Sequence, residues 1–149
     1  MGRSERGAGP RWLGAGLAAA VILAAGTSLA GGDQSYADLR QAVLDGRDIR
    51  VTLDLAACRV HGTDRPGPPV RGSVRFDAYM IEGDGSIAFS MRHFTVQNGT
   101  TPVDEFLTFK VAPDGRIDAH SRFFNAATLV PFNEAEFDCD IGRGTAFHW

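Results

Sequence analysis

Apolar and polar residues follow first a helical period and then a strand period along the chain. Between residues 36 and 44 apolar side chains recur every three or four positions, which predicts an amphipathic helix. Ser35, just before this segment, has the side chain of an N-cap. Gly46, just after it, can adopt the left-handed conformation that ends helices. The sequence therefore predicts one N-terminal helix over residues 36–44.

The period changes to two immediately after this helix. Ile49, Val51, Leu53 and Leu55 alternate with polar residues, as in a strand with one buried face. The segment from Arg59 to Pro69 is rich in proline and glycine, so it predicts a stiff loop without regular structure.

Alternation continues through most of the remaining chain. It predicts further strands over residues 70–80, 87–93, 106–111, 116–123 and 137–141. Glycine, asparagine, aspartate and proline separate most of these strands and indicate turns. Residues 125–136 have no clear period. Ala126 to Leu129 is compatible with a short helical turn, and Pro131 is expected to interrupt any strand.

These elements predict a mainly β fold, with α+β as the alternative description. The short connections favour a single antiparallel meander, either a bent sheet or a small barrel. The N-terminal helix would cover one face or one open end of it. The pattern leaves open which strand pairs with which.

The first thirty residues predict an export signal. Three arginines precede an apolar run from Trp12 to Ala25, and Ser28 and Ala30 are small enough for a signal peptidase pocket. We therefore expect residues 1–30 to be a signal peptide, cut between Ala30 and Gly31. An uncleaved membrane anchor is the alternative, but the run is weakly hydrophobic and short for a span of about 20 residues.

Cleavage would leave a single domain, residues 31–149, in the periplasm or secreted, with no stable membrane insertion. The signal removes three arginines and one glutamate from the chain's 15 basic and 18 acidic residues. The mature domain therefore keeps 12 basic and 17 acidic residues, a net charge of −5. Because nucleic acid repels such a domain and its basic residues form no cluster, nucleic acid is not expected as a partner.

Cys58 and Cys139 are the two cysteines of the chain. In an exported protein an even count predicts a disulfide, and two cysteines allow one pairing. Closing a loop of about 80 residues would stabilise the fold by roughly 4 kcal/mol. The bridge is expected to tie the first strand to the last. Two buried free thiols are the alternative, and without a Cys-x-x-Cys spacing a redox role is not favoured.

Several segments carry a resemblance to a known family. They are Leu44–Asp48, Gly72–Ile81, His93–Val96, Thr101–Val103 with Glu105–Leu107, Phe137–Cys139 and the ending Phe147–Trp149. In these segments and in its paired cysteines the chain resembles the VirK family of exported bacterial proteins. The resemblance supports bacterial export, and it implies no reaction, ligand or catalytic residue.

Histidines are the candidate bases and metal ligands at neutral pH. His61, His93, His120 and His148 are dispersed without the spacing of a metal motif. We therefore predict no metal site and no cofactor, since a zinc site would have to be assembled entirely by the fold. His93 continues the apolar row of its strand, which favours a packed histidine bonded to a backbone carbonyl.

Carboxylates and hydroxyls form no catalytic motif either. Glu134, Glu136, Asp138 and Asp140 would line one face of a strand, which indicates a solvated acidic stripe. No serine lies in a Gly-x-Ser-x-Gly sequence. No catalytic residue is therefore predicted, and the sequence favours a protein that is not an enzyme.

The ten phenylalanines suggest a recognition surface beside the core. The favoured interpretation is a non-enzymatic binding or accessory module for a small apolar ligand or an envelope protein. The candidate binding residues, near the proline-rich loop and the aromatic C-terminus, are His61, Arg65, His93, Phe147, His148 and Trp149. One alternative is a small hydrolase or lyase that uses a carboxylate and His93 or His120. Another is an accessory subunit of an envelope or secretion assembly.

Overall fold

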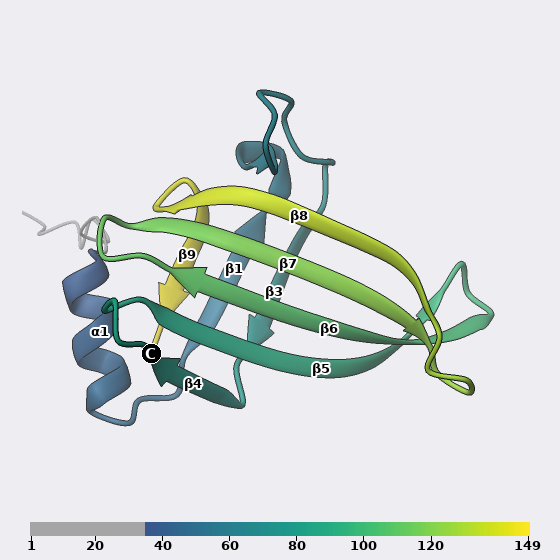
Figure 1. Ribbon diagram of the computed structural model, residues 1–149, viewed down its shortest axis with the longest axis horizontal. Coiled ribbons are helices and arrows are strands. Elements are labelled where there is room, and N and C mark those ends of the chain that lie inside the picture. The colour runs from purple at the N-terminus through teal and green to yellow at the C-terminus, as the bar shows by residue number, and fades with distance from the viewer. Residues whose placement is uncertain (1–34) are drawn as a thin grey trace, which may run out of the picture. The chain divides into compact units, whose positions relative to one another are not determined.

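The computed structural model describes residues 35–149, which contain one helix, one 3-10 turn and nine strands (Figure 1). The elements are α1 (Tyr36–Leu44), β1 (Arg50–Asp54), η1 (Leu55–Ala57), β2 (Arg59–Val60), β3 (Arg71–Arg75), β4 (Ala78–Ile81), β5 (Ile87–Gln97), β6 (Thr101–Val111), β7 (Arg116–Asn125), β8 (Pro131–Ile141) and β9 (Gly144–His148). The predicted signal peptide, residues 1–30, lies outside the described residues. Within residues 35–149, no helix is long and apolar enough to span a membrane.

Helix α1 has the predicted bounds because local interactions cap both of its ends. The Ser35 hydroxyl accepts a hydrogen bond from the Asp38 amide (3.2 Å), and the Asp38 carboxylate accepts one from the Ser35 amide (3.1 Å). At the other end Gly46 has a φ of +69°, and the Arg47 amide donates to the Ala42 carbonyl. These contacts confirm the helix predicted over residues 36–44.

The nine strands form one sheet whose two edges are joined by a very short connection. The strand order is β3-β1-β9-β8-β7-β6-β5-β4, and β2 pairs with β8. The edge strands β3 and β4 are separated in sequence only by Phe76 and Asp77. Three Cα–Cα steps of about 3.8 Å place the end of β3 at most about 11 Å from the start of β4. The sheet therefore has to curl into a half-barrel.

The hydrophobic core lies inside this curl, at the end that α1 covers (Figure 1). The Phe76 ring stacks on Phe89 at 4.7 Å between centroids, and Phe89 is 5.8 Å from Phe147. The Tyr79 hydroxyl donates to the Val43 carbonyl of α1 (2.8 Å). We call the face of the sheet that carries these rings the inner face, and the opposite one the outer face.

The mainly β class, with one N-terminal helix and one disulfide, is confirmed, but the strand pairing is more complex than a meander. Strands β4 to β8 follow one another as antiparallel neighbours. Strand β9 then inserts between β8, to which it is parallel, and β1, to which it is antiparallel. The single strand predicted over residues 70–80 was wrong, because the chain leaves one sheet edge after Arg75 and enters the other at Ala78.

Two further segments differ from their predictions. The loop from Arg59 to Pro69 is not wholly irregular, since its first two residues form β2 against β8. Pro131 does not interrupt a strand but begins β8, the position where a missing amide donor is tolerated. A β-bulge beside it shifts the β7–β8 register between Phe123 and Phe124.

The disulfide between Cys58 and Cys139 is present and spans 81 residues of sequence. Its place in the sheet differs from the prediction, because Cys139 lies in β8 and the last strand is β9. The bridge therefore joins the end of η1 to the centre of the sheet. Gly144, at the start of β9, packs against it closely: a Cβ there would lie 2.5 Å from the Cys58 sulfur.

Breaking the disulfide should lower the free energy of unfolding by roughly 4 kcal/mol, because the unfolded chain regains the entropy of an 80-residue loop. The double variant Cys58→Ala/Cys139→Ala tests this in urea unfolding. Reduced wild-type protein, which keeps both sulfur atoms in place, is the control for lost packing. A loss below about 1 kcal/mol in both samples would contradict the prediction.

Gly144→Ala should destabilise the protein more than Gly142→Ala. The two glycines have nearly the same φ, +81° and +80°, so both substitutions carry the same backbone strain of about 1–2 kcal/mol. Only at Gly144 does the new methyl group also meet the Cys58 sulfur, whereas nothing lies within 4 Å of it at Gly142. Overpacking should add about 1–3 kcal/mol, measured as the difference in unfolding free energy. Equal losses would show that the close approach is unimportant.

Candidate functional site

A cavity of about 410 Å³ lies on the inner face, lined by residues from both halves of the curled sheet. Leu107 and Phe137 belong to the long strands. Leu53 comes from β1, and Pro68 and Val70 come from the loop before β3. The edge-to-edge curl thus places the proline-rich loop opposite the long strands. We call this space the inner cavity.

One carboxylate lies among these apolar walls because of the alternation of β6. Val103, Leu107, Phe109 and Val111 are all buried on the inner face. Glu105 occupies the same row, so its side chain points inward with them, and it is only 14% exposed. It lines the inner cavity.

Two neighbouring strands supply polar partners for Glu105. The Ser121 hydroxyl of β7 donates to Glu105 Oε1 (2.5 Å), and His93 Nε2 of β5 lies 3.2 Å from Glu105 Oε2. His93 and Glu105 are directly opposed in the β5–β6 register. The carboxylate is held in place from both sides and has acceptor capacity left for a further donor. This trio is the polar part of the candidate site.

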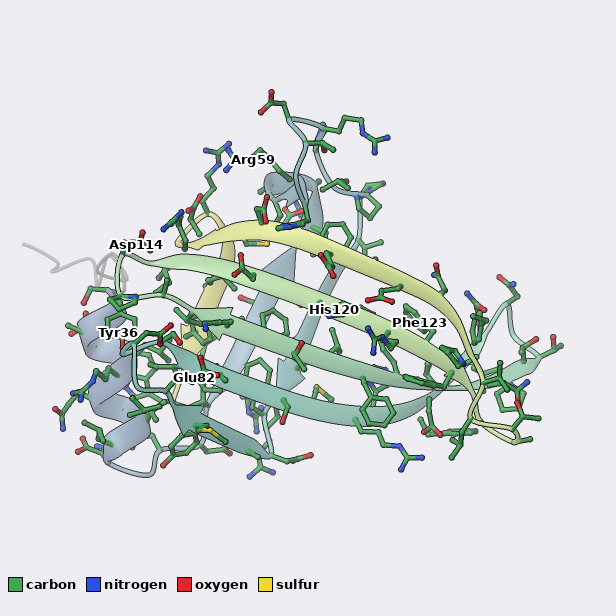
Figure 2. The ribbon with its side chains drawn as sticks, in the orientation of Figure 1. Tyr36, Arg59, Glu82, Asp114, His120 and Phe123 are labelled. Atoms are coloured by element: carbon green, nitrogen blue, oxygen red, sulfur yellow. A yellow bond between two sulfur atoms is a disulfide. The ribbon has the colours of Figure 1, made fainter. Side chains whose placement is uncertain are left out.

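The outer face carries a row of charged groups on β7 and β8. His120 Nε2 lies 2.5 Å from Glu134 Oε1 and 3.7 Å from Glu136 Oε1. Arg122 donates to the same Glu134 oxygen (2.8 Å), and this hydrogen bond lowers the pKa of the Glu134 carboxyl. His61 pairs with the next acid, Asp138 (2.7 Å). Figure 2 shows His120 midway along the long strands.

His61, the first residue after β2, forms an ion pair with Asp138 of β8. Its hydrogen bond to Asp138 raises the pKa of the His61 imidazole and lowers the pKa of the Asp138 carboxyl. Both partners are thereby favoured in their charged forms. The predicted acidic stripe on β8 is therefore not only solvated, because His61, His120 and Arg122 contact it.

These groups border a hollow of about 500 Å³ on the outer face, which we call the outer hollow. His61, His120 and Glu136 line one part of it, and Glu82 and Lys110 line another. The Lys110 ammonium lies 2.7 Å from Glu82.

Asp84 binds the same ammonium group at 3.3 Å. Two hydrogen bonds from Ser86, together with Lys110, lower the pKa of Asp84 to about 2. Asp84, in the turn after β4, therefore stays anionic beside Lys110. This ion pair accounts for the presence of Asp84 without a catalytic role.

The structure separates three of the predicted binding residues, His61, Arg65 and His93. His61 lies on the outer face, and Arg65 is exposed at the far part of its loop, where its amide donates to Thr63 Oγ1 (3.2 Å). His93 lies on the inner face. It is bonded to a carboxylate rather than to the backbone carbonyl that the sequence suggested.

The C-terminal candidates do not form a shared surface with that loop. Phe147 is fully buried in the core. His148 is exposed and its Nε2 lies 3.2 Å from Thr52 Oγ1, while Trp149 is 47% exposed. Of the six predicted binding residues, His93 alone belongs to the polar trio, through its contact with Glu105, which lines the inner cavity.

Sequence reasoning missed Glu105 and Ser121. The predicted strand began at Phe106, one residue too late to place Glu105 in the buried row. The sequence signal for Glu105 was its spacing: it lies two residues from both Val103 and Leu107, so the three side chains point to the same face of the strand. Ser121 likewise continues the buried alternation of Ile117 and Ala119.

Exposed apolar side chains gather near the ends of the two long hairpins, away from α1. They are Phe94, Val96, Phe106, Leu129, Val130 and Phe132. Several large apolar residues thus lie outside the core, as the phenylalanine content suggested. The accessory-subunit hypothesis, which would need such a surface, stays a prediction.

A family model and two curated relatives match this chain. Residues 33–129 match the family model described as VirK protein. The uncharacterised protein y4wH of Sinorhizobium fredii is 35% identical over 131 residues, which cover 85% of this chain and 90% of the relative. An uncharacterised protein in the pinF2 3′ region of Rhizobium radiobacter is 30% identical over 114 residues, covering 76% and 79%.

A solved structure gives the same answer for the fold. The crystal structure of a VirK family protein from Legionella pneumophila superimposes with a TM-score of 0.70 at 22% sequence identity, covering 78% of this chain and 98% of that one. The family match confirms the resemblance to the VirK family, and the solved structure shares the fold. The chain therefore belongs to the VirK family.

Proposed function

We propose that the protein is an exported binding protein, periplasmic or secreted, that holds a small and mainly apolar ligand in the inner cavity. The observation that carries the proposal is the cavity of about 410 Å³ with apolar walls and one carboxylate. Ligand sites typically measure about 300–1,000 Å³ and combine apolar walls with a few fixed polar groups. The inner cavity has this composition.

The polar trio supports a defined orientation of the ligand. Glu105 is held by Ser121 and His93, so its position does not depend on the ligand. A hydroxyl or amine of the ligand would donate to the free lone pairs of this carboxylate, while the apolar part contacts Leu107 and Phe137. Such an arrangement favours an amphiphilic molecule over a pure hydrocarbon.

The loop wall of the cavity is held by backbone hydrogen bonds. The Gly67 amide donates to the Cys58 carbonyl (3.0 Å), the Leu55 amide to the Val70 carbonyl (2.9 Å) and the His61 amide to the Glu136 carbonyl (3.0 Å). The disulfide fixes the start of this loop at Cys58. A wall fixed before binding reduces the entropy that the ligand has to overcome.

An exported location is supported by two independent features. The first thirty residues have the pattern of a cleavable signal. The disulfide is a bond that persists in oxidising compartments and is rare in the cytosol. A ligand of the periplasm or of the cell exterior follows from that location.

Filling the inner cavity should abolish binding. The probe is N-phenyl-1-naphthylamine, a neutral apolar amine whose fluorescence rises in apolar sites. Ala135 lines the cavity, so Ala135→Trp should weaken probe binding at least about tenfold, equal to 1.4 kcal/mol. The matched control is Ala56→Trp, at an exposed position of η1, which should bind like wild type.

Two results would overturn the proposal. One is an absence of probe binding to the wild-type protein. The other is equal binding by both tryptophan variants, which would place the probe elsewhere, such as on the exposed apolar residues of the hairpin ends. Circular dichroism of each variant verifies that the fold is retained. A bound molecule seen by native mass spectrometry of protein isolated from its own envelope would identify the natural ligand.

A small hydrolase or lyase is the second candidate function, favoured by one specific observation. His93 and Glu105 lie 3.2 Å apart beside a cavity, and Ser121 contacts the same carboxylate. General acid and base catalysis needs such groups within hydrogen-bond reach of a substrate. The carboxylate lies between the serine and the histidine, so Glu105 would be the base for the Ser121 hydroxyl.

Glu105→Gln separates the two candidates. If the protein is an enzyme, wild type should hydrolyse small apolar esters, and the variant should lose at least about 100-fold in rate while it still binds the probe. Hydrolysis that is absent in wild type, or equal in the two proteins, would remove the enzymatic alternative.

A further inference from the structure

We propose that His120, Glu134 and Glu136 form a binding site for a divalent transition metal ion such as Zn²⁺ on the outer face. The site lies on the face opposite the polar trio, and it does not depend on the function proposed for the inner cavity. It takes an ion through one imidazole nitrogen and two carboxylates. No spacing motif along the chain indicates this site, because its ligands come from two strands.

The β7–β8 pairing brings the three side chains together. His120 is directly opposite Glu136 in the register, and Glu134 is the next residue of β8 that faces outward. Directly opposed residues of an antiparallel pair have Cβ atoms about 4.5–5.5 Å apart. The backbone therefore fixes the relative positions of the three ligands.

The ligand atoms are close enough for one ion. The nearest nitrogen and oxygen atoms of the three side chains all lie within 4.8 Å of one another. Zinc binds such atoms at about 2.0–2.2 Å with tetrahedral geometry, so two ligand atoms of one ion are roughly 3.4 Å apart. Small rotations of the two carboxylates bring all three atoms into this range. Glu134 has to move away from His120, since they are now 2.5 Å apart.

His120 Nε2 is shielded from solvent, and its close neighbour is Glu134 Oε1 at 2.5 Å. Two of the three proposed ligand atoms are therefore already in contact. In the metal-bound form the imidazole lone pair would bind the ion in place of this contact.

Charge and access also fit a divalent ion. Two carboxylates and a neutral imidazole carry a charge of −2, of which Arg122 balances one unit through Glu134. The second oxygen of Glu136 lies 3.9 Å from His61 Nε2, which can steady that carboxylate. The site borders the outer hollow, so water or a substrate atom has room to be the fourth ligand.

The test uses zinc alone as the probe, with the purified full mature protein. Isothermal titration should show one Zn²⁺ per chain, and zinc should raise the melting temperature through preferential binding to the folded state. His120→Ala should weaken binding at least about 100-fold, and Glu136→Gln at least about tenfold. Both variants should lose the zinc-dependent rise in melting temperature at matched zinc concentration.

His148→Ala is the matched control, because His148 is an exposed histidine on β9, outside the cluster. It should bind zinc like wild type. The proposal is overturned if wild type binds no zinc, or if His120→Ala and His148→Ala bind it equally. Imidazole nitrogen chemical shifts in NMR give a direct readout, since coordination should move the His120 Nε2 signal and leave His148 unchanged. Probe binding to the inner cavity should be unaffected in Glu136→Gln, because Glu136 does not line that cavity.

Discussion

The two-residue connection between the edge strands β3 and β4 is the constraint on which the rest of the molecule depends. Because Phe76 and Asp77 cannot span more than about 11 Å, the first and last strands of the sheet order must approach each other. Phe76 then falls into the core, where it stacks on Phe89. Helix α1 covers that end of the sheet, and buried apolar side chains fill the space between them. Farther along the long strands the walls remain apart, and they enclose the inner cavity.

The parts of the fold that depend on local interactions could be predicted from the sequence. Helix α1 follows from its capping residues, and the disulfide follows from the cysteine count. The break between β3 and β4 could not be predicted, because Val74 and Phe76 continue the same alternation across it. Only the pairing with distant strands decides that the chain changes edges. Pro131 was misread for a similar reason, since its position at the start of β8 depends on the register with β7.

The candidate sites likewise have parts that the local sequence predicts and parts that depend on pairing with other strands. His93 could be placed on an inward-facing row from its own strand, but its partner Glu105 lies on the neighbouring strand, before the point where the alternation of β6 becomes clear. His120 and Glu136 are 16 positions apart in the sequence, and no spacing rule connects them. The antiparallel register makes them direct neighbours. Chemistry that is built across strands leaves little trace in a single sequence, whereas chemistry built along one helix often leaves a motif.

The position of β9 has a consequence for the order of folding. This last strand lies inside the sheet, where it joins β1 from the first part of the chain to β8 from the last. Until residues 144–148 are available, the β3–β1 pair and the long strands have no strand between them. A chain emerging from a ribosome can therefore form its hairpins early, but it completes the half-barrel only at the end. The two parts of the sheet are therefore joined through β9 in one late step.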